Sequence, residues 1–395
     1  MSLTLVTMLS CGQGAMTLVE VYDMGDLTQP ADFLALIDCG SDDINVPGMT
    51  GGAIKYVTDK VLARKPSVLD LVVLSHQDKD HINLLPELGK RLGAAGVKVK
   101  EIYRCGVNWD PDKSEPDVLE FAQRVHYTGS LQFDLNPRSD YWAKSPTCIA
   151  QYKKKVFFRI LFMNMPSTVK KEKNQSSGVV VVEDVSSAPH LIAVLPGDIT
   201  CHTMGWIHDQ VGEPNERHPL RDVVVLAAPH HGARATAVTR CGGRWENFDR
   251  FAQTVRPQHL GASAGPGNRH DHPVFEVLDR FRGGVDNVKV VSGVSSHGYA
   301  TFVEAADEWE NKTVSEGIWS TVSYFDEAEK RLSRKRRSPA SGAPAAPSPF
   351  INTKMADIVI TLHATLGVKQ RVKLRPVTPG NFLTARDLVL LAPAP

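Results

Sequence analysis

Two histidines and two aspartates stand within six positions directly after an apolar run, in the stretch VVLSHQDKDH at residues 72–81. His76, Asp78 and Asp80 occupy positions i, i+2 and i+4, and His81 follows Asp80. A loop that leaves the end of a buried strand can fold these side chains around cations, and imidazole and carboxylate groups suit Zn²⁺, Mn²⁺ or Fe²⁺. The alternative interpretation is helix capping, with Asp80 as the N-cap, but capping explains only one aspartate. The cluster therefore predicts a metal site.

Ligand-type residues also follow two later apolar runs. Asp198 comes after LIAVLPG, and His230 and His231 come after VVVLAAP. Taken alone, an aspartate after glycine is usually a turn residue, and a histidine pair is usually a surface or packing feature. All three runs nevertheless end in possible ligands, and open α/β sheets place their sites at the carboxyl ends of their strands. The pattern predicts one rim that carries all of these side chains.

The elements that must position them alternate between strand and helix patterns. Strands are expected at 4–10, 17–23, 33–41, 68–74, 98–106, 155–163, 178–184, 190–198, 222–232, 287–293, 299–305 and 318–325. The first three are expected to form a meander at the edge of a sheet. Helices are expected at 51–63, 83–96 and 274–282. The polar, proline-containing stretch 107–150 is expected to be an irregular insertion or a lid.

The organisation of the chain changes near its end. Residues 1–328 are expected to form the main domain, and the basic, then Pro, Ala and Ser rich residues 329–352 a flexible linker. Residues 353–395 contain two alternating strand patterns, too few to form a core of their own. We expect a small β-rich segment that packs on the main domain or on a protein partner.

Composition excludes several classes of protein. The 395 residues are 42% hydrophobic, and 45 Lys and Arg balance 44 Asp and Glu, so bulk charge indicates no partner. The longest apolar runs fall well short of the roughly 20 residues that cross a bilayer, and the N-terminus lacks a secretory leader. We therefore expect a cytoplasmic protein with no membrane contact. Its six scattered cysteines form no CxxC pair and are expected to be reduced thiols.

Seven motifs in order resemble those of metallo-β-lactamase-fold hydrolases of the ComEC-like branch. They are GQG (12–14), LIDCGS (36–41), SHQDKDH (75–81), NQSSGVVVV (174–182), LPGD (195–198), APHHGA (228–233) and GPGNRHDHP (265–273). The resemblance covers about residues 3–325 and implies an α+β fold, the four-layer αβ/βα sandwich, with a dinuclear metal site between two β-sheets. Phosphodiester hydrolysis is the commonest chemistry that it implies.

The resemblance also assigns ligands to two divalent ions, Zn²⁺ or Mn²⁺. His76 and Asp78 would hold one ion, Asp80 and His81 the other, and Asp198 would bridge them. One residue of the pair His230 and His231 would complete the shell, with His231 preferred.

Several positions depart from the pattern of the resemblance. Asp78 replaces the middle histidine of HxHxDH, and Asn174 stands where a separate histidine would precede the Gly-Asp turn. This oxygen-rich set makes manganese a rival to zinc. Ser10 and Ala15 replace acidic residues around GQG, and Asn83 replaces a glycine after the metal motif, which suggests altered activity and a changed loop.

Two cations would supply a hydroxide at neutral pH and stabilise the phosphoryl transition state, so no side-chain nucleophile is needed. Asp80 counts among the catalytic residues as a ligand. His272, Arg269 or His297 could protonate the leaving group or contact phosphate, although His297 is equally consistent with a strand-edge histidine.

The expected function is hydrolysis of phosphodiester bonds, with DNA as the preferred substrate. Basic runs at 153–155, at 170–173 and in SRKRR could follow a phosphate backbone, although such runs are usually solvated surface. One alternative is hydrolysis of a small phosphodiester, such as a cyclic nucleotide or a phosphocholine group, under a lid formed by 107–150. Another is a binding role in a multi-protein system, with the C-terminal segment as the docking piece.

Overall fold

The protein is described by a computed structural model. It describes residues 2–9, 11–42, 49–106, 109–129, 131, 147–164, 173–212, 220–263, 277, 280–281, 289–294, 301–303, 324–326, 331–333, 355–363, 366 and 372–377. The strands there form a seven-stranded sheet, an eight-stranded sheet and a separate two-stranded pair.

The first sheet has the order β17-β16-β1-β2-β3-β4-β5. Its strands are β1 (Leu3–Met8), β2 (Thr17–Tyr22), β3 (Phe33–Ile37), β4 (Val68–Leu74), β5 (Lys98–Arg104), β16 (Met355–Leu362) and β17 (Val372–Val377). Strands β3, β4 and β5 are parallel, and the others pair antiparallel. The expected meander β1-β2-β3 is present, but its place at an edge is wrong, because the hairpin β16-β17 adds to β1 from outside.

The second sheet has the order β13-β12-β11-β10-β9-β8-β7-β6. Its strands are β6 (Thr147–Tyr152), β7 (Val156–Phe162), β8 (Val179–Asp184), β9 (Leu191–Leu195), β10 (Val223–Ala227), β11 (His259–Ser263), β12 (Lys289–Val294) and β13 (Thr301–Val303). Strands β9 to β12 are parallel. The separate pair is β14 (Tyr324–Asp326) with β15 (Arg331–Ser333).

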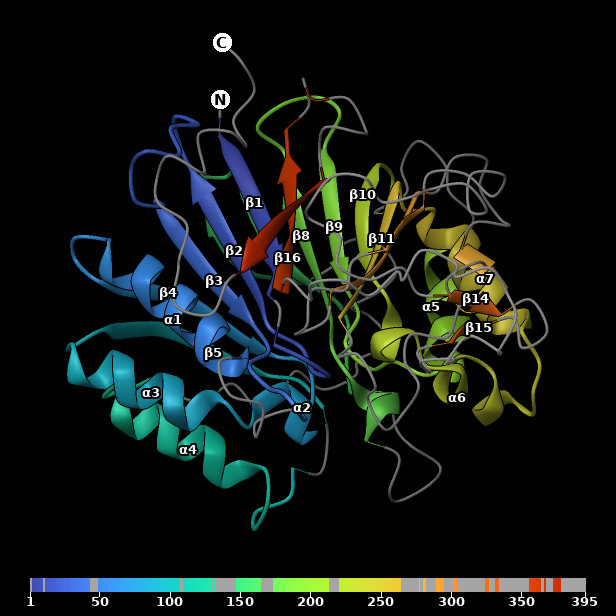
Figure 1. Cartoon of the computed structure of the whole chain (residues 1–395), viewed down its shortest axis with the longest axis horizontal. Coiled ribbons are helices and arrows are strands. Elements are labelled where there is room, and N and C mark those ends of the chain that lie inside the picture. Colours follow the sequence, from blue (N-terminus) through green and yellow to red (C-terminus); the bar gives the residue numbers. More distant parts are fainter. Residues whose placement is uncertain are drawn as a thin grey trace, which may run out of the picture.

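Helices cover the outer face of each sheet (Figure 1). The first sheet carries α1 (Met49–Leu62), α3 (Leu85–Ala94) and α4 (Glu115–Arg124), and the second carries α5 (Cys201–Val211) and α7 (Glu246–Val255). Shorter elements are α2 (Lys79–Ile82), α6 (Arg234–Ala237), η2 (Asn174–Ser176), η3 (Pro229–Gly232) and η4 (Thr239–Cys241). None of the helices in the described part of the chain has the length and hydropathy to span a bilayer.

Alternation along the strands divides the core into three layers. In β1, Leu3 and Leu5 face the helices, whereas Val6 joins the layer between the two sheets. The same alternation in β4 sends Leu69 outward and Leu71 inward, because successive side chains of a strand point to opposite faces. Two sheets that share one apolar layer, each covered by helices, form a four-layer αβ/βα sandwich. The expected fold class is confirmed.

The stretch 107–150 is not irregular throughout. Residues 115–124 form helix α4, which begins with a proline in its first turn and packs on α3. Val118, Phe121 and Ala122 form its buried face at the spacing of a helix. Of the expected helix at 274–282, only 277 and 280–281 lie within the described residues.

The cysteine expectation is wrong for one pair. Cys201 and Cys241 form a disulfide across a sequence separation of 40 residues. Cys11, Cys39 and Cys105 are buried and belong to no disulfide, as expected. Spacing could not reveal the disulfide, because folding brings its two cysteines together.

Candidate metal centre

The segment after β4, residues 75–81, is here called the ligand loop. It carries His76 and includes the first three residues of the short helix α2, among them Asp80 and His81. Asp78 stands at the N-cap of α2, but its side chain makes no capping hydrogen bond. The capping interpretation therefore does not explain these aspartates.

Two glycines explain why the ligand loop lies so close to its neighbours. A Cβ on Gly14 would lie 2.8 Å from the carbonyl oxygen of Asp80, and a Cβ on Gly40 would lie 2.4 Å from the backbone nitrogen of His81. The amide of Ala15 donates to the Asp80 carbonyl at 2.9 Å, and that of residue 39 donates to the His81 carbonyl at 2.7 Å. The motifs GQG and LIDCGS thus support the backbone of the ligand loop.

Asn83, which departs from the glycine of the resemblance, also supports this loop. Its side-chain oxygen accepts from the amide of Ser41 at 2.9 Å, and its side-chain nitrogen donates to the carbonyl of Ser41 at 2.7 Å. Glycine could not make either bond, so the substitution fixes the end of α2 against the LIDCGS loop.

Asp198 lies at the centre of four histidines, and each of its oxygens faces two of them. Oδ2 is 3.7 Å from Nε2 of His76 and 3.3 Å from Nε2 of His230. Oδ1 is 3.1 Å from Nε2 of His81 and 3.8 Å from Nε2 of His231. The preceding Gly197 has φ of +56°, and a Cβ there would lie 2.4 Å from Ser177 Oγ, so this turn requires glycine.

One aspartate of the ligand loop belongs to each histidine pair. Asp78 Oδ2 is 3.6 Å from Nε2 of His76, and Asp80 Oδ2 is 3.4 Å from Nε2 of His231. The side chains therefore form two sets on either side of the carboxylate of Asp198. The first set is His76, Asp78 and His230, and the second set is Asp80, His81 and His231.

The two neighbouring histidines reach different oxygens because their backbone is left-handed. His230 and His231 have φ of +46° and +54°, a conformation that is uncommon for residues other than glycine. The amide of His230 donates to the carbonyl of Gly197 at 3.0 Å, which holds the pair beside Asp198. Asn174 lies 3.3 Å from Nδ1 of His230 through its side-chain nitrogen. Both His230 and His231 therefore face Asp198, whereas the sequence pattern favoured His231 of the two.

The second nitrogen of two rings is held by neighbouring side chains. His76 Nδ1 lies 3.0 Å from Ser75 Oγ, and His81 Nδ1 lies 2.8 Å from Asp38 Oδ2. Asp38 also accepts from the amide and the hydroxyl of Ser75, each at 2.7 Å. Asp38 was not predicted as a site residue, although an aspartate directly after a buried strand was a usable signal. Such partners orient metal-binding histidines and set their tautomer.

Burial and unmatched nitrogen atoms favour a cation at the centre. Nε2 of His76, His81 and His231 is buried and makes no hydrogen bond of acceptable geometry, although carboxylate oxygens lie nearby. Buried polar atoms are normally satisfied, so such a group of atoms calls for a partner. Asp80, His81, Asp198 and His231 offer ligand atoms that all lie within 4.8 Å of one another. The donor set fits divalent metal ions.

The charges of the site are interdependent. Burial lowers the pKa of His81, but the carboxylates of Asp198 and Asp38 outweigh it and hold this pKa well above its ordinary value. Burial would raise the pKa of Asp198, but the surrounding histidines hold it well below its ordinary value. The pKa of His230 is lowered, chiefly by burial. A cation can replace the proton of His81, because both neutralise the same carboxylates.

Other sequence expectations fall outside this centre. Arg269, His272 and His297 lie outside the described residues. Lys153 and Lys155 each lie 2.7 Å from Asp23, so an acidic neighbour already neutralises part of this basic run. Of the run 170–173, Lys173 is described, and its Nζ lies 3.6 Å from Asp78 Oδ1.

A second group of ligand-type side chains lies at the start of α5 and the end of η4. It consists of Cys201, His202 and Cys241. Because its two sulfur atoms are joined in the disulfide, they are not available as thiolate ligands in this structure.

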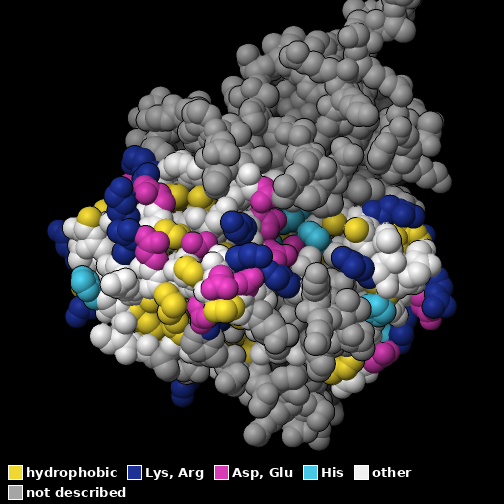
Figure 2. All heavy atoms as spheres, turned by 90° about the horizontal axis from the view of Figure 1, so that it is seen from below, with side chains coloured by type: hydrophobic (Ala, Val, Ile, Leu, Met, Phe, Trp, Pro, Cys, Tyr) yellow, Lys and Arg dark blue, Asp and Glu magenta, His cyan; other side chains and the backbone are white. Residues whose placement is uncertain are grey.

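Figure 2 views the molecule from the lower edge of the sheets in Figure 1. Histidine and acidic side chains gather near the middle of this face, and Lys and Arg side chains lie around them. The face therefore combines groups that hold cations with groups that attract anions.

No protein-family model matches the chain, and no curated protein matches it by sequence. Solved structures do match it. The metallo-β-lactamase fold protein YhfI from Bacillus subtilis is 16% identical and aligns over 76% of this chain and 99% of its own, with a TM-score of 0.39. Unliganded yeast PDE1 is 11% identical over 75% of this chain and 99% of its own, with a TM-score of 0.42. A diphosphatase from the PhnP family is 13% identical over 66% of this chain and 85% of its own, with a TM-score of 0.30.

Proposed function

We propose that the chain is a metal-dependent hydrolase that cleaves phosphodiester bonds with two divalent cations, Zn²⁺ or Mn²⁺, held on either side of Asp198. The observation that carries this proposal is the division of the site by the two oxygens of Asp198, each of which faces two histidines. A carboxylate that offers one oxygen to each of two histidine sets is suited to bridging two cations. The single aspartate in each set adds a hard oxygen ligand that suits manganese as well as zinc.

When bound, two such cations would lower the pKa of a coordinated water toward about 7 and offset the charge of a phosphoryl transition state. The residues of this chain supply the rest. His76, His81 and His231 direct Nε2 toward the centre, and Asp38 holds His81 from behind. Lys173, with its side chain 38% exposed beside Asp78, adds a positive charge that would attract an anionic substrate to the centre.

We propose nucleic acid, and DNA in the first place, as the substrate. Lys and Arg side chains around the histidines and acids in Figure 2 support a polyanion rather than a neutral substrate. A small phosphodiester is the alternative, and Arg269, His272 and His297 remain candidates for the leaving-group proton in either case.

Metal analysis and substrate digestion test this proposal. The purified protein is loaded with Mn²⁺ or Zn²⁺, the bound metal is counted, and single-stranded, duplex and circular DNA and bis(p-nitrophenyl) phosphate are offered as substrates. We expect two ions per chain and cleavage of at least one DNA substrate. Hydrolysis of the small ester without cleavage of DNA would favour the small-substrate alternative, and no turnover with either would favour a binding role.

Variants of the two sets sharpen the result. Asp198→Asn should abolish turnover, because the side chain would bind the cations. It should change the free energy of unfolding little, because the residue lies at the end of a strand and outside the apolar core. His230→Ala and His231→Ala should each remove one bound ion, since the two rings face different oxygens of Asp198. His190→Ala is the matched control, since this ring is 39% exposed and pairs with Glu183 instead. Loss of both ions from His231→Ala but none from His230→Ala would contradict a role for His230.

A further inference from the structure

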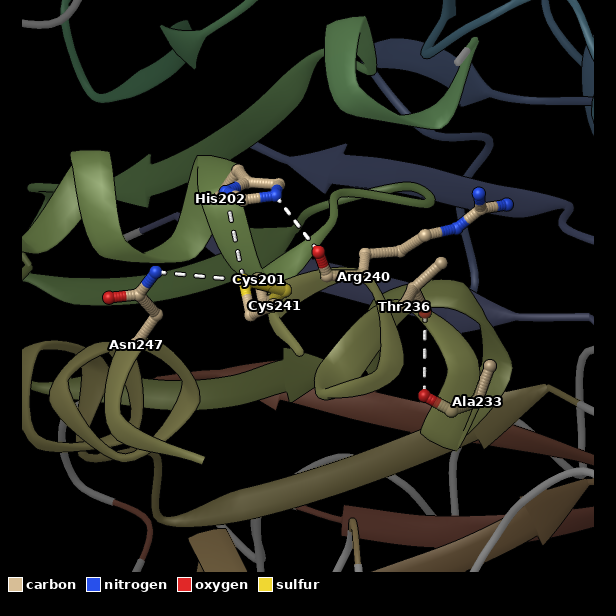
Figure 3. Close-up of a disulfide and its surroundings, with 7 residues drawn as sticks. All are labelled: Cys201, His202, Ala233, Thr236, Arg240, Cys241 and Asn247. Atoms are coloured by element: carbon tan, nitrogen blue, oxygen red, sulfur yellow. Dashed lines mark hydrogen bonds between the residues drawn. A yellow bond between two sulfur atoms is a disulfide. The ribbon is translucent and has the colours of Figure 1, made fainter. Parts of the chain in front are cut away.

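The disulfide of Cys201 and Cys241 joins the two segments that carry the candidate metal centre (Figure 3). Cys201 is buried at the first position of α5, three residues after Asp198. Cys241 is half-buried at the end of η4, ten residues after His231. Helix α6 and η4 connect η3, which contains the histidine pair, to Cys241. The bond therefore links the Asp198 turn to the segment that follows the histidines.

The two sulfur atoms differ in their access to solvent. His202, whose side chain is exposed, places Nδ1 3.7 Å from Cys241 Sγ, and its Nε2 lies 3.1 Å from the carbonyl of Arg240. Asn247 donates its side-chain amide to the same sulfur at 3.7 Å. In Figure 3 these side chains surround Cys241. Cys201 is fully buried and Cys241 is half-buried, so we take Cys241 Sγ as the sulfur that a reagent attacks.

A surface depression beside Cys241 carries charges of both signs. Its walls include Arg244, Glu246 and Asn247. Arg240 also lines it, but in Figure 3 its side chain extends away from the disulfide, and its backbone carbonyl is the group beside His202. One cationic and one anionic residue match a small thiol that bears carboxylate and ammonium groups, such as glutathione, better than they match a neutral thiol.

We propose that this disulfide is a thiol–disulfide exchange site for a charged low-molecular-weight thiol of the glutathione class. The incoming thiolate attacks Cys241 Sγ, the bond between the two cysteine sulfurs breaks, and the electron pair leaves on Cys201. The N-terminus of the 11-residue helix α5 stabilises negative charge at this position. His202 accepts the proton of the attacking thiol and returns it to a released sulfur.

A second thiol molecule completes the reaction. It attacks the sulfur that belongs to the small thiol in the mixed disulfide, and Cys241 is released as a thiol. Two small thiols are oxidised to one small disulfide, and the protein disulfide is reduced to two cysteine thiols, so atoms, electrons and protons balance. The reverse sequence needs only the disulfide of the same small molecule as the oxidant.

The exchange would regulate the candidate metal centre, a consequence that rests on the proposed function. Reduction removes the covalent link between the Asp198 turn and the segment after His231. The left-handed residues His230 and His231 are then held to that turn by the hydrogen bond from the His230 amide to the Gly197 carbonyl. We expect the reduced protein to bind its metal ions about tenfold more weakly, as for the loss of a group that orients ligands.

The experiment uses the full chain with Cys148→Ser, which removes the exposed free thiol. The protein is incubated with mixtures of reduced and oxidised glutathione, then quenched with acid, and peptide masses locate the adducts. We expect glutathione on Cys241, none on Cys201, and two new thiols at high reducing ratios. An adduct on Cys201, or a disulfide that native protein retains at every ratio, would overturn the proposal.

A second comparison tests the choice of a charged thiol. Arg244→Gln with Glu246→Gln should slow reduction by glutathione several-fold and leave reduction by neutral 2-mercaptoethanol unchanged. Equal slowing of both reagents would contradict the charge argument. These readouts are masses and thiol counts and need no turnover, so a failure of the exchange is distinct from a failure of the proposed hydrolase activity. Unchanged metal affinity after complete reduction would sink only the regulatory consequence.

Discussion

Replacement of Asp38 by asparagine tests how the protein holds a ligand from behind. Asp38 accepts three hydrogen bonds, from the amide of Ser75, from its hydroxyl and from Nδ1 of His81. Its φ of +58° is no obstacle, since asparagine tolerates the left-handed region at least as well. The variant therefore changes the hydrogen-bonding pattern with little change in backbone or volume.

Asparagine cannot replace all three bonds. If its amide nitrogen faces His81, Nδ1 must accept, and the ring proton moves to Nε2, which is the atom that faces Asp198. If the side-chain nitrogen of the new asparagine faces the backbone amide of Ser75 instead, two N–H donors face each other and that hydrogen bond is lost. Loss of an orienting partner typically weakens metal binding about 10 to 100-fold, which corresponds to about 1.4–2.8 kcal/mol.

An opposing effect has to be separated from this one. Asp38 is one of the two carboxylates that raise the pKa of His81, so its removal lowers that pKa and weakens the competition of a proton with the metal. A proton competes with the metal less as the pH rises, whereas the wrong tautomer of His81 persists at every pH. The metal affinity of Asp38→Asn should therefore fall further below that of the wild type at the higher of two pH values.

The assay is a titration with Zn²⁺ or Mn²⁺ against a chromophoric chelator at two pH values. Asp184→Asn is the matched control, because Asp184 is equally buried and accepts from Thr4 at 2.7 Å but belongs to β8, outside the site. It should lower stability without a change in metal affinity. Wild-type affinity in Asp38→Asn at both pH values would refute the argument that this carboxylate sets the tautomer.

Three further predictions follow from burial and charge. Metal-free protein should lose stability as the pH rises above 6.5. The pKa of His81 is higher in the folded chain than in the unfolded chain, so protonation of His81 stabilises the fold fully below pH 6.5, and this contribution is lost as the pH rises through the folded pKa. Thermal melts with and without metal should therefore diverge as the pH rises. Gly40→Ala should weaken metal binding at least tenfold, since its Cβ would overlap the ligand loop, whereas Gly51→Ala, with open space in α1, should raise stability by about 0.5–1 kcal/mol in denaturant titrations. Glu20→Gln should cost about 3 kcal/mol, because it breaks the buried 2.6 Å ion pair with Lys60. Burial opposes ionisation of Glu20, but Lys60 outweighs it and lowers the pKa, so wild-type stability should fall as the pH drops below 4.5, and the variant should lack this dependence.

The reducible disulfide adds a stability prediction of its own. A cross-link over a separation of 40 residues lowers the conformational entropy of the unfolded chain, which in the chain-entropy model stabilises the folded state by about 4 kcal/mol. Cys201→Ser with Cys241→Ser should lose stability on that scale in denaturant titrations. A loss below about 1 kcal/mol would indicate that the native state relaxes when the bond is absent.

The sequence by itself determined much of this molecule. Nearly unbroken apolar runs predicted β4, β9 and β10, because strands buried on both faces need mostly apolar side chains. Polar residues at the ends of those runs predicted the rim, and the structure brings His76, Asp198 and His231 together there. Helical spacing located α1 and α3. These features depend on local patterns of side-chain burial, which a sequence displays directly.

Tertiary structure alone decided the rest. Local spacing gave no reason for both His230 and His231 to reach Asp198, because that depends on a left-handed backbone held by Gly197 across the site. The partnership of Asp38 with His81 and the link of Cys201 to Cys241 join residues 43 and 40 positions apart. The hairpin β16-β17 likewise joins the first sheet from the far end of the chain. Such contacts arise when whole layers pack, and their energies depend on neighbours that no short window of sequence contains.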